Sequence, residues 1–330
     1  EGGLLLSKPY YIVPHPNDLI QPGTEGAWEG RKFTVLGRIR AWIEEFLPNY
    51  WTIAYADGQV AYLVEGYGIY AVYERTTIER QLSSKNLDEV KSGVRRDLFS
   101  KKTFVLERKY TCYKWEIEGE VYLPECDSSF RIFEWAHFGG QRIELIEFRR
   151  DQISTFSVNY TSFAHLRFTH LRTPSDSVKT ISCAHCATAN TIQGFPYAQS
   201  YACRHCGSRY SLQEGSQFKK LLDRNNTDSG PNITLGARGV LKGIEYEVVG
   251  YAQKEEQNQY RSRWKEYTLY NPQEGFAFLS EFDGHWIYIR ERGDAPVLPK
   301  HQVKEFTYQE EPFQLYNAYR FEVVNASGTF

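Results

Sequence analysis

Cys183-Ala-His-Cys186 and Cys203-Arg-His-Cys206 are two Cys-x-x-Cys motifs separated by sixteen residues. Zn²⁺ favours four soft ligands in a tetrahedron, and short hairpins can bring two such pairs together. Each pair is followed by turn residues rather than by the start of a helix, which is typical of a zinc ribbon and unlike a redox motif. The sequence therefore predicts one structural Zn²⁺ that is bound by all four cysteines and has no ligand position left for catalysis.

A block of glycines and strand residues occurs on both sides of this motif. Gly23–Gly37 and Gly236–Gly250 share the pattern Gly-x-x-Gly-x-x-x-Gly-x-x-Phe/Tyr-x-Val-x-Gly at an offset of 213. Trp51 and Trp264 keep that offset. Four matched glycines in one frame are improbable by chance when glycine makes up about 7% of residues. The pattern predicts an internal duplication.

Two further blocks follow in the same order. Leu63–Tyr70 matches Leu279–Trp286 at an offset of 216, which places a length difference of three residues in the intervening hairpin. Tyr110–Ile117 matches Tyr316–Val323 at an offset of 206. Three blocks in one order predict the same domain twice.

The residues within these blocks are typical of strands and turns. Apolar residues alternate with other residues at Phe33 and Val35, and glycines supply turns or bulges beside them. The chain has 24 Tyr, 20 Phe and 7 Trp, which also favours strands. We therefore predict a mainly β protein, with two homologous small β-barrel or β-sandwich domains and a four-cysteine zinc ribbon between them.

The expected domain organisation has four parts. An extended, proline-rich arm at 1–21, with a short strand near Tyr10, precedes a first repeat domain at 22–172. The zinc ribbon and its linkers occupy 173–214, and the second repeat domain occupies 215–330.

Two features distinguish the first repeat from the second. The spacing of apolar residues predicts a short amphipathic helix over 87–98, with Asn86 as its N-cap. The first repeat also continues through strands at 130–135 and 142–148, which have no counterpart before Phe330. We therefore expect the second repeat to be truncated at its C-terminal end, and the native polypeptide to continue.

Composition makes some classes of protein improbable. A net charge of −2 and a pI near 6.5 give no electrostatic reason to expect nucleic acid as a partner. No apolar run is long enough to span a membrane. Because zinc thiolates survive best where thiols stay reduced, we expect a cytoplasmic protein in which Cys112 and Cys126 are free.

Catalytic motifs are absent from the sequence. It lacks a phosphate-binding Gly-Lys-Ser/Thr loop, a dinucleotide fingerprint and a Gly-x-Ser-x-Gly elbow. Glu65 and Glu281 recur at matching places in the two repeats. Each is either a carboxylate of a binding groove or a strand residue that forms hydrogen bonds with its neighbours. The second interpretation is favoured because no acid–base partner recurs beside them. The sequence predicts no catalytic residue, and whether the protein is an enzyme stays open, with the balance towards a non-enzyme.

The blocks of the second repeat resemble a family. Trp264–Tyr270 has the form Trp-x-Glu-Tyr-x-Leu-Tyr, and Gly275–Trp286 has the form Gly-x-x-x-Leu-x-Glu-x-x-Gly-x-Trp. With the glycine pattern, they are similar to an uncharacterised bacterial domain-of-unknown-function family, found in tandem around a zinc ribbon and often encoded near phage-shock membrane-stress genes. The first repeat departs from the pattern where Ile53 and Ala54 replace the Glu-Tyr pair.

The resemblance implies no established activity. The leading hypothesis is a non-enzymatic, zinc-containing adaptor that binds protein partners in a membrane-stress or envelope-maintenance system, with membrane association through parts of the native protein outside these residues. A small-ligand-binding or hydrolytic domain with an aromatic groove is the alternative, and nucleic-acid binding through the ribbon is a third. The groove residues would be Trp264, Glu266, Tyr267, Glu281 and Trp286, with Trp51, Glu65 and Tyr70 in the first repeat.

Overall fold

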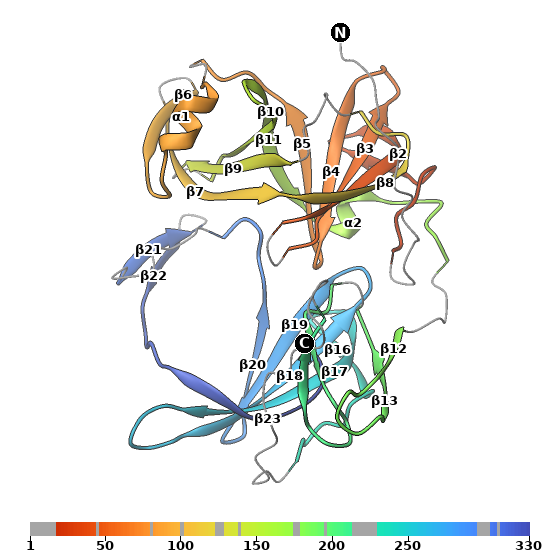
Figure 1. Cartoon of the computed structure of the whole chain (residues 1–330), viewed down its shortest axis with the longest axis vertical. Coiled ribbons are helices and arrows are strands. Elements are labelled where there is room, and N and C mark those ends of the chain that lie inside the picture. The colour runs from red at the N-terminus through yellow and green to blue at the C-terminus, as the bar shows by residue number, and fades with distance from the viewer. Residues whose placement is uncertain are drawn as a thin grey trace. The chain divides into compact units, whose positions relative to one another are not determined.

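A computed structural model shows two compact, mainly β units (Figure 1). The first comprises Ile20–Arg172 together with Arg292–Leu315, and the second comprises Thr173–Glu291 together with Tyr316–Phe330. The structure describes residues 18–43, 46–79, 82–99, 102–122, 129–137, 140–173, 179–194, 197–212, 230–295, 304–308 and 311–330. The strand expected near Tyr10 and the thiol of Cys126 lie outside these residues.

The first unit is built on one antiparallel sheet with the strand order β1-β2-β3-β4-β5-β11-β10-β9-β7-β6, in which β8 also pairs with β2. A small sheet, β21-β22, and two short helices complete it. The elements are β1 (Glu25–Trp28), β2 (Arg31–Trp42), β3 (Asn49–Tyr55), β4 (Val60–Gly66), β5 (Ile69–Arg75), α1 (Ser84–Glu89), β6 (Arg95–Phe99), β7 (Lys102–Cys112), β8 (Lys114–Gly119), β9 (Phe130–His137), β10 (Arg142–Arg149), β11 (Gln152–Thr161), α2 (Phe163–Leu166), β21 (Glu305–Tyr308) and β22 (Glu311–Gln314).

The second unit contains a hairpin, β12-β13, and an antiparallel sheet with the order β15-β14-β23-β17-β18-β19-β20, in which β16 pairs with β17. Its strands are β12 (Lys179–Ser182), β13 (Ala189–Ile192), β14 (Ser200–Ala202), β15 (Arg209–Ser211), β16 (Arg238–Leu241), β17 (Ile244–Glu256), β18 (Arg263–Asn271), β19 (Gly275–Phe282), β20 (His285–Arg290) and β23 (Phe321–Thr329).

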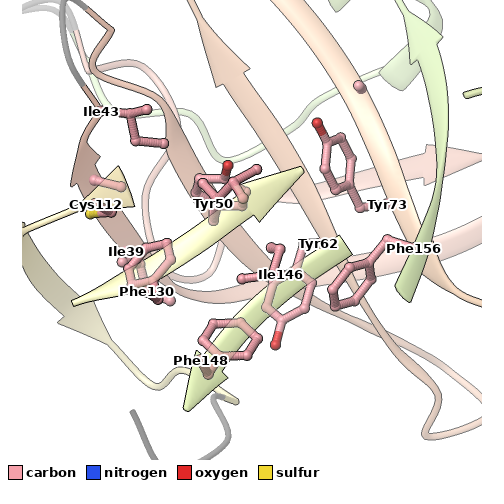
Figure 2. Packing of buried hydrophobic residues seen from close by; sticks show 13 residues of the cluster. Ile39, Ile43, Tyr50, Tyr62, Tyr73, Cys112, Phe130, Ile146, Phe148 and Phe156 are labelled. Atoms are coloured by element: carbon pink, nitrogen blue, oxygen red, sulfur yellow. The ribbon is translucent and has the colours of Figure 1, made fainter. Parts of the chain in front are cut away.

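The mainly β prediction is confirmed, but the closed barrel, one of the two expected forms beside the sandwich, is not observed. Among the strands that the structure describes, each main sheet runs from one edge to another and none closes. In the first unit, β9–β11 instead cover one face of β2–β5, so that Ile146 and Phe156 pack in one buried cluster with Ile39, Tyr50 and Tyr62 (Figure 2). The face is therefore buried by the chain's own additional strands rather than by closure.

The strand pairing of the two units agrees in detail. The order β1-β2-β3-β4-β5, with β8 on β2, has the same form as β16-β17-β18-β19-β20, with β23 on β17. The ladder β2–β3 has a bulge between Val35 and Gly37, and β17–β18 has one between Val248 and Gly250. A common origin of the two units is not established by this agreement and stays a prediction.

Paired glycines explain why the glycine pattern recurs. Gly37 lies opposite Gly119, and Gly250 lies opposite Gly328. A Cβ atom on Gly37 would come within 2.4 Å of a backbone oxygen, and one on Gly250 within 2.1 Å. Only glycine therefore allows β8 and β23 to approach the bulged strands this closely.

The structural register corrects two of the sequence offsets. Trp51 lies opposite Arg38, whereas the residue opposite the equivalent Tyr251 is Tyr267, not Trp264. The three-residue difference therefore lies in the loop between the first two long strands, before β3 and β18, and not in the following hairpin. The third block also aligns differently, because the paired glycines of β8 and β23 are offset by 209 rather than 206.

The predicted helix over 87–98 is much shorter in the structure. α1 ends at Glu89, and Asn86 lies in its first turn, where its side chain bonds back to the N-cap. The backbone is already extended at Val90, and Gly93 turns the chain with φ at +90°. Of the apolar residues further on, Leu98 belongs to β6 and Val94 directly precedes it. Their spacing matched that of a helix only over a short window.

Candidate functional site

Two loops of the same form hold the four cysteines. In the first, the N–H of Cys183 donates to the carbonyl of Thr188, and the N–H of Ala187 donates back to Cys183 at 2.8 Å. In the second, Cys203 bonds Ser208 and Gly207 bonds Cys203 in the same way, again at 2.8 Å. Ala187 and Gly207 have left-handed backbones, with φ at 57° and 71°. Each turn aims two sulfur atoms inward.

The sulfur atoms gather at the spacing of a four-thiolate metal site. All four lie within 4.8 Å of one another. The Sγ atoms of Cys183 and Cys206 are 3.7 Å apart, and those of Cys186 and Cys203 are 3.6 Å apart. A tetrahedron with metal–sulfur bonds of about 2.3 Å has edges of about 3.8 Å. The predicted ligands are thus brought together with a geometry that is compatible with a metal ion.

Nearby polar groups support these sulfur atoms. Asn190 is buried, and its amide nitrogen lies 3.6 Å from the Sγ of Cys203 while it donates to the carbonyl of Thr188 at 2.8 Å. Its amide oxygen accepts the N–H of Arg204, at 3.0 Å. Asn190 therefore joins one loop to the other. His185 and His205 are exposed.

The surroundings of three of the thiols shift their pKa values in different directions. The hydroxyl of Thr188, close to the sulfur, lowers the pKa of Cys186 to about 5. Burial acts to raise the pKa of Cys183, but hydrogen bonding with Tyr210 and with backbone N–H groups outweighs it, and the net shift is downward. Burial raises the pKa of Cys206 to about 11. Two of the sulfur atoms are therefore predisposed to the thiolate form that a metal requires.

One half of the ribbon, β14-β15, is continuous with the second unit's main sheet, whereas β12-β13 forms its own two-stranded sheet. β14 pairs with β23 through Tyr201 and Ala202. The ribbon's buried cluster includes Cys183, Cys203 and Tyr210, and Phe276 of β19 packs against it. Order at the cysteines is therefore coupled to one end of the main sheet.

The residues expected to form an aromatic groove do not share one face. Tyr267 stacks on Trp286 with ring centroids 5.9 Å apart, and both lie on the side of the sheet that Glu281 occupies. Trp264 and Glu266 alternate with Tyr267 along β18 and therefore point to the other side. A single groove of these five residues is ruled out by the pleat of the strand.

The corresponding residues of the first unit are largely buried. Trp51 and Tyr70 belong to the core, and Glu65 accepts hydrogen bonds from Asn49 at 2.8 Å and from the indole N–H of Trp51 at 3.3 Å. Glu281 likewise accepts the backbone N–H of its own turn at Gly284, at 3.3 Å. Both glutamates make the neighbouring bonds that the simpler interpretation of the sequence expected.

The second unit also has an exposed apolar surface that the sequence analysis missed. Phe282 is 51% exposed, Ile287 61% and Ile289 41%. Ile289 lies opposite Phe278 across the strands, so the two share a face. We call the following set the open face: Trp264, Phe278, Phe282, Ile287, Ile289 and Phe321. The alternation in β20 was a signal for it, but exposure depends on which strands pack nearby.

One charged pair lies on the same side as the open face. Lys254 contacts Glu266 at 2.5 Å, and its ammonium lies 4.5 Å from the ring centre of Phe321. Trp264 packs edge-on against Phe321, with centroids 5.6 Å apart. The surface is therefore mainly apolar with a neutralised ion pair within it.

Comparison with known proteins identifies one domain. A domain of unknown function, DUF4178, is found at residues 234–330. No curated protein and no solved structure matches the chain. In the described parts of the chain, no helix is both long and apolar enough to cross a membrane.

Proposed function

We propose that this protein is a non-enzymatic scaffold, in which a zinc-bound ribbon steadies the second unit and the open face binds a protein partner. The observation that carries the proposal is the exposure of Phe282, Ile287 and Ile289 on one sheet. Contiguous exposed apolar side chains are costly in water and are typical of surfaces that meet other proteins.

The first unit supports this interpretation of the open face. Its cross-strand pair Tyr62–Tyr73 holds the place that Phe278–Ile289 holds in the second unit. Tyr62 and Tyr73 are buried, and Phe156 of β11 packs against both rings. The same surface is therefore covered by additional strands in one unit and exposed in the other. A protein partner would supply the missing cover.

Zinc is the metal that we assign to the ribbon. Four cysteine ligands without a histidine or carboxylate favour a soft ion, and a closed set of four leaves no position for water or substrate. The metal would thus act in folding rather than in catalysis. The proposal retains the cytoplasmic location, which was expected because zinc thiolates survive best where thiols stay reduced. It also retains the membrane-stress setting that the family resemblance implies.

The zinc assignment is tested by elemental analysis of the purified chain. We expect one zinc per chain, and loss of that zinc in Cys203→Ser. Hydrogen exchange of 179–212 should accelerate after chelation, because the ribbon's cluster is organised around the sulfur atoms. A metal-free preparation with unchanged protection in the ribbon would contradict a structural role. Another element at full occupancy would contradict zinc.

The scaffold role is tested by comparing partners recovered from the native host with the parent chain and with Phe282→Asp. Val240→Asp is the matched control, because Val240 is also exposed but lies on β16, away from the open face. We expect the Phe282 variant to lose proteins that the parent and the control retain. Equal recovery by all three would contradict partner binding through the open face.

A further inference from the structure

We propose that two copies of this chain associate through antiparallel pairing of their β20 strands. β20 is the last strand of its sheet, and within the described ranges no strand pairs with its outer side. Five of its six residues are exposed, and the remaining one, Tyr288, is half-buried. Its backbone groups are therefore available to another strand.

The first unit indicates what kind of strand completes such an edge. There, β5 holds the place of β20, and β11 pairs with its outer side in antiparallel orientation. Val158 lies opposite Tyr73, and Tyr160 lies opposite Ala71. In β20 these two places belong to Ile289 and Ile287, as the matching hairpin registers require. The occupant should therefore be antiparallel, with apolar residues two positions apart.

β20 of a second copy has this chemistry. A two-fold axis through Tyr288 would place Ile287 opposite Ile289 of the second copy, and the reverse pair would form by symmetry. The same register would place the exposed His285 opposite the exposed Glu291 of the second copy. Apolar residues meet apolar residues, and an acid meets a histidine, on both sides of the axis.

The neighbouring registers are less favourable. Residues that lie opposite each other must point to the same face of the sheet. The two-fold axis must therefore pass through a residue of β20 and cannot pass between two residues. An axis through Ile287 would place Glu291 opposite Asp283, which brings two like charges together at both ends. An axis through Ile289 would place Ile287 opposite Glu291. The sequence of β20 therefore favours the register about Tyr288.

β20 also lacks three of the features that keep edge strands apart. Natural edges are often protected by lysine, proline or a bulge. The strand His-Trp-Ile-Tyr-Ile-Arg has no lysine or proline, and its ladder with β19 runs without a register shift from Phe282 to Ala277. Such a regular, exposed edge would associate with other strands unless its own partner is defined. A self-complementary sequence provides that partner in every copy.

The association extends the scaffold function proposed above, although it does not depend on it. A two-fold axis perpendicular to the sheet keeps equivalent faces on the same side. The open faces of two copies would then be continuous across the paired β20 strands. A dimer would present a surface of twice the area, which suits a partner with two equivalent binding segments.

The experiment is sedimentation equilibrium of the full chain over a micromolar-to-millimolar concentration series. We expect a monomer–dimer equilibrium in the parent. His285→Glu should raise the dimer dissociation constant about tenfold, since it places two pairs of like charges across the interface. Adding Glu291→Lys should restore the parent value, because the glutamate introduced in each copy would then face a lysine of the other. Glu245→Lys, an exposed change on β17, is the matched control and should have no effect.

Each outcome decides the question. A parent that remains monomeric throughout the series overturns the proposal. A dimer that withstands both His285→Glu and Ile287→Asp uses another surface and also overturns it. Weakening by His285→Glu without recovery in the double variant would refute the register about Tyr288. None of these results bears on partner capture by Phe282→Asp, so failure of the scaffold function can be recognised separately.

Discussion

Glu144→Gln is expected to remove a strong pH dependence from the stability of the first unit. Glu144 is a buried residue of β10, and its carboxyl group accepts a hydrogen bond from Tyr73 at 2.9 Å and lies 3.5 Å from the hydroxyl of Tyr50. Both rings belong to the cluster shown in Figure 2. Glu134 lies directly opposite on β9. Little water therefore reaches the carboxyl group, and a second acid lies beside it.

The structure gives a magnitude for this effect. Burial, and then the charge of Glu134, raise the pKa of Glu144 from 4.5 to about 8, although hydrogen bonds from Tyr73 and Tyr50 act in the opposite direction. One pKa unit corresponds to about 1.4 kcal/mol, so the full shift corresponds to an upper value of about 5 kcal/mol. A contribution of this size to the free energy of unfolding is large for one side chain.

The direction follows from proton binding. Between roughly pH 4.5 and pH 8 the folded state keeps a proton on Glu144 that the unfolded state has released. The free energy of unfolding therefore falls as the pH rises through this window, and the full contribution is present only below the unfolded pKa. A glutamine keeps the shape and the hydrogen-bonding capacity without ionising. We expect Glu144→Gln to flatten the dependence and to be more stable than the parent near pH 8.

Urea unfolding followed by circular dichroism, at a series of pH values across this window, measures the effect. The informative quantity is the difference in the free energy of unfolding between variant and parent at each pH, because every other ionisable group is the same in both proteins. Glu89→Gln is the matched control, since Glu89 is exposed at the end of α1. A difference that does not change with pH would refute the assignment of a neutral, buried carboxyl group to Glu144.

Three further predictions concern the backbone and the core. Gly37→Ala should destabilise the first unit by at least about 2 kcal/mol in urea unfolding, because its Cβ would meet backbone atoms, whereas Gly239→Ala, with open space around it, should be nearly neutral. Ala187→Gly should raise the thermal stability of the metal-bound ribbon by about 0.5 kcal/mol, because glycine adopts the left-handed backbone at this position without the steric strain of a Cβ atom. A lower melting temperature would contradict this. Trp51→Phe should cost about 2 kcal/mol, since it removes the indole N–H that donates to Glu65, and an unchanged urea midpoint would contradict that role.

The sequence by itself determined the mainly β class, the cysteine cluster and the recurring glycines. These features are encoded locally. Two Cys-x-x-Cys turns position their sulfur atoms through bonds within each turn, such as that between Ala187 and Cys183. Glycine is required wherever a Cβ would meet a backbone, as at Gly37. Alternation and aromatic content indicate strands without any knowledge of their neighbours.

Only the tertiary structure decided register, face and exposure. A bulge and a longer loop shift the pairing, so Tyr267 and not Trp264 takes the place of Trp51, and alternate residues of β18 point to opposite faces. Whether the edge of a strand is paired depends on segments far away in sequence. β11 pairs with the outer edge of β5, whereas the outer edge of β20 has no such neighbour among the described residues. The raised pKa of Glu144 likewise arises from strands that meet only in the fold. Local patterns specify what a strand can pair with, but long-range packing determines what it does pair with.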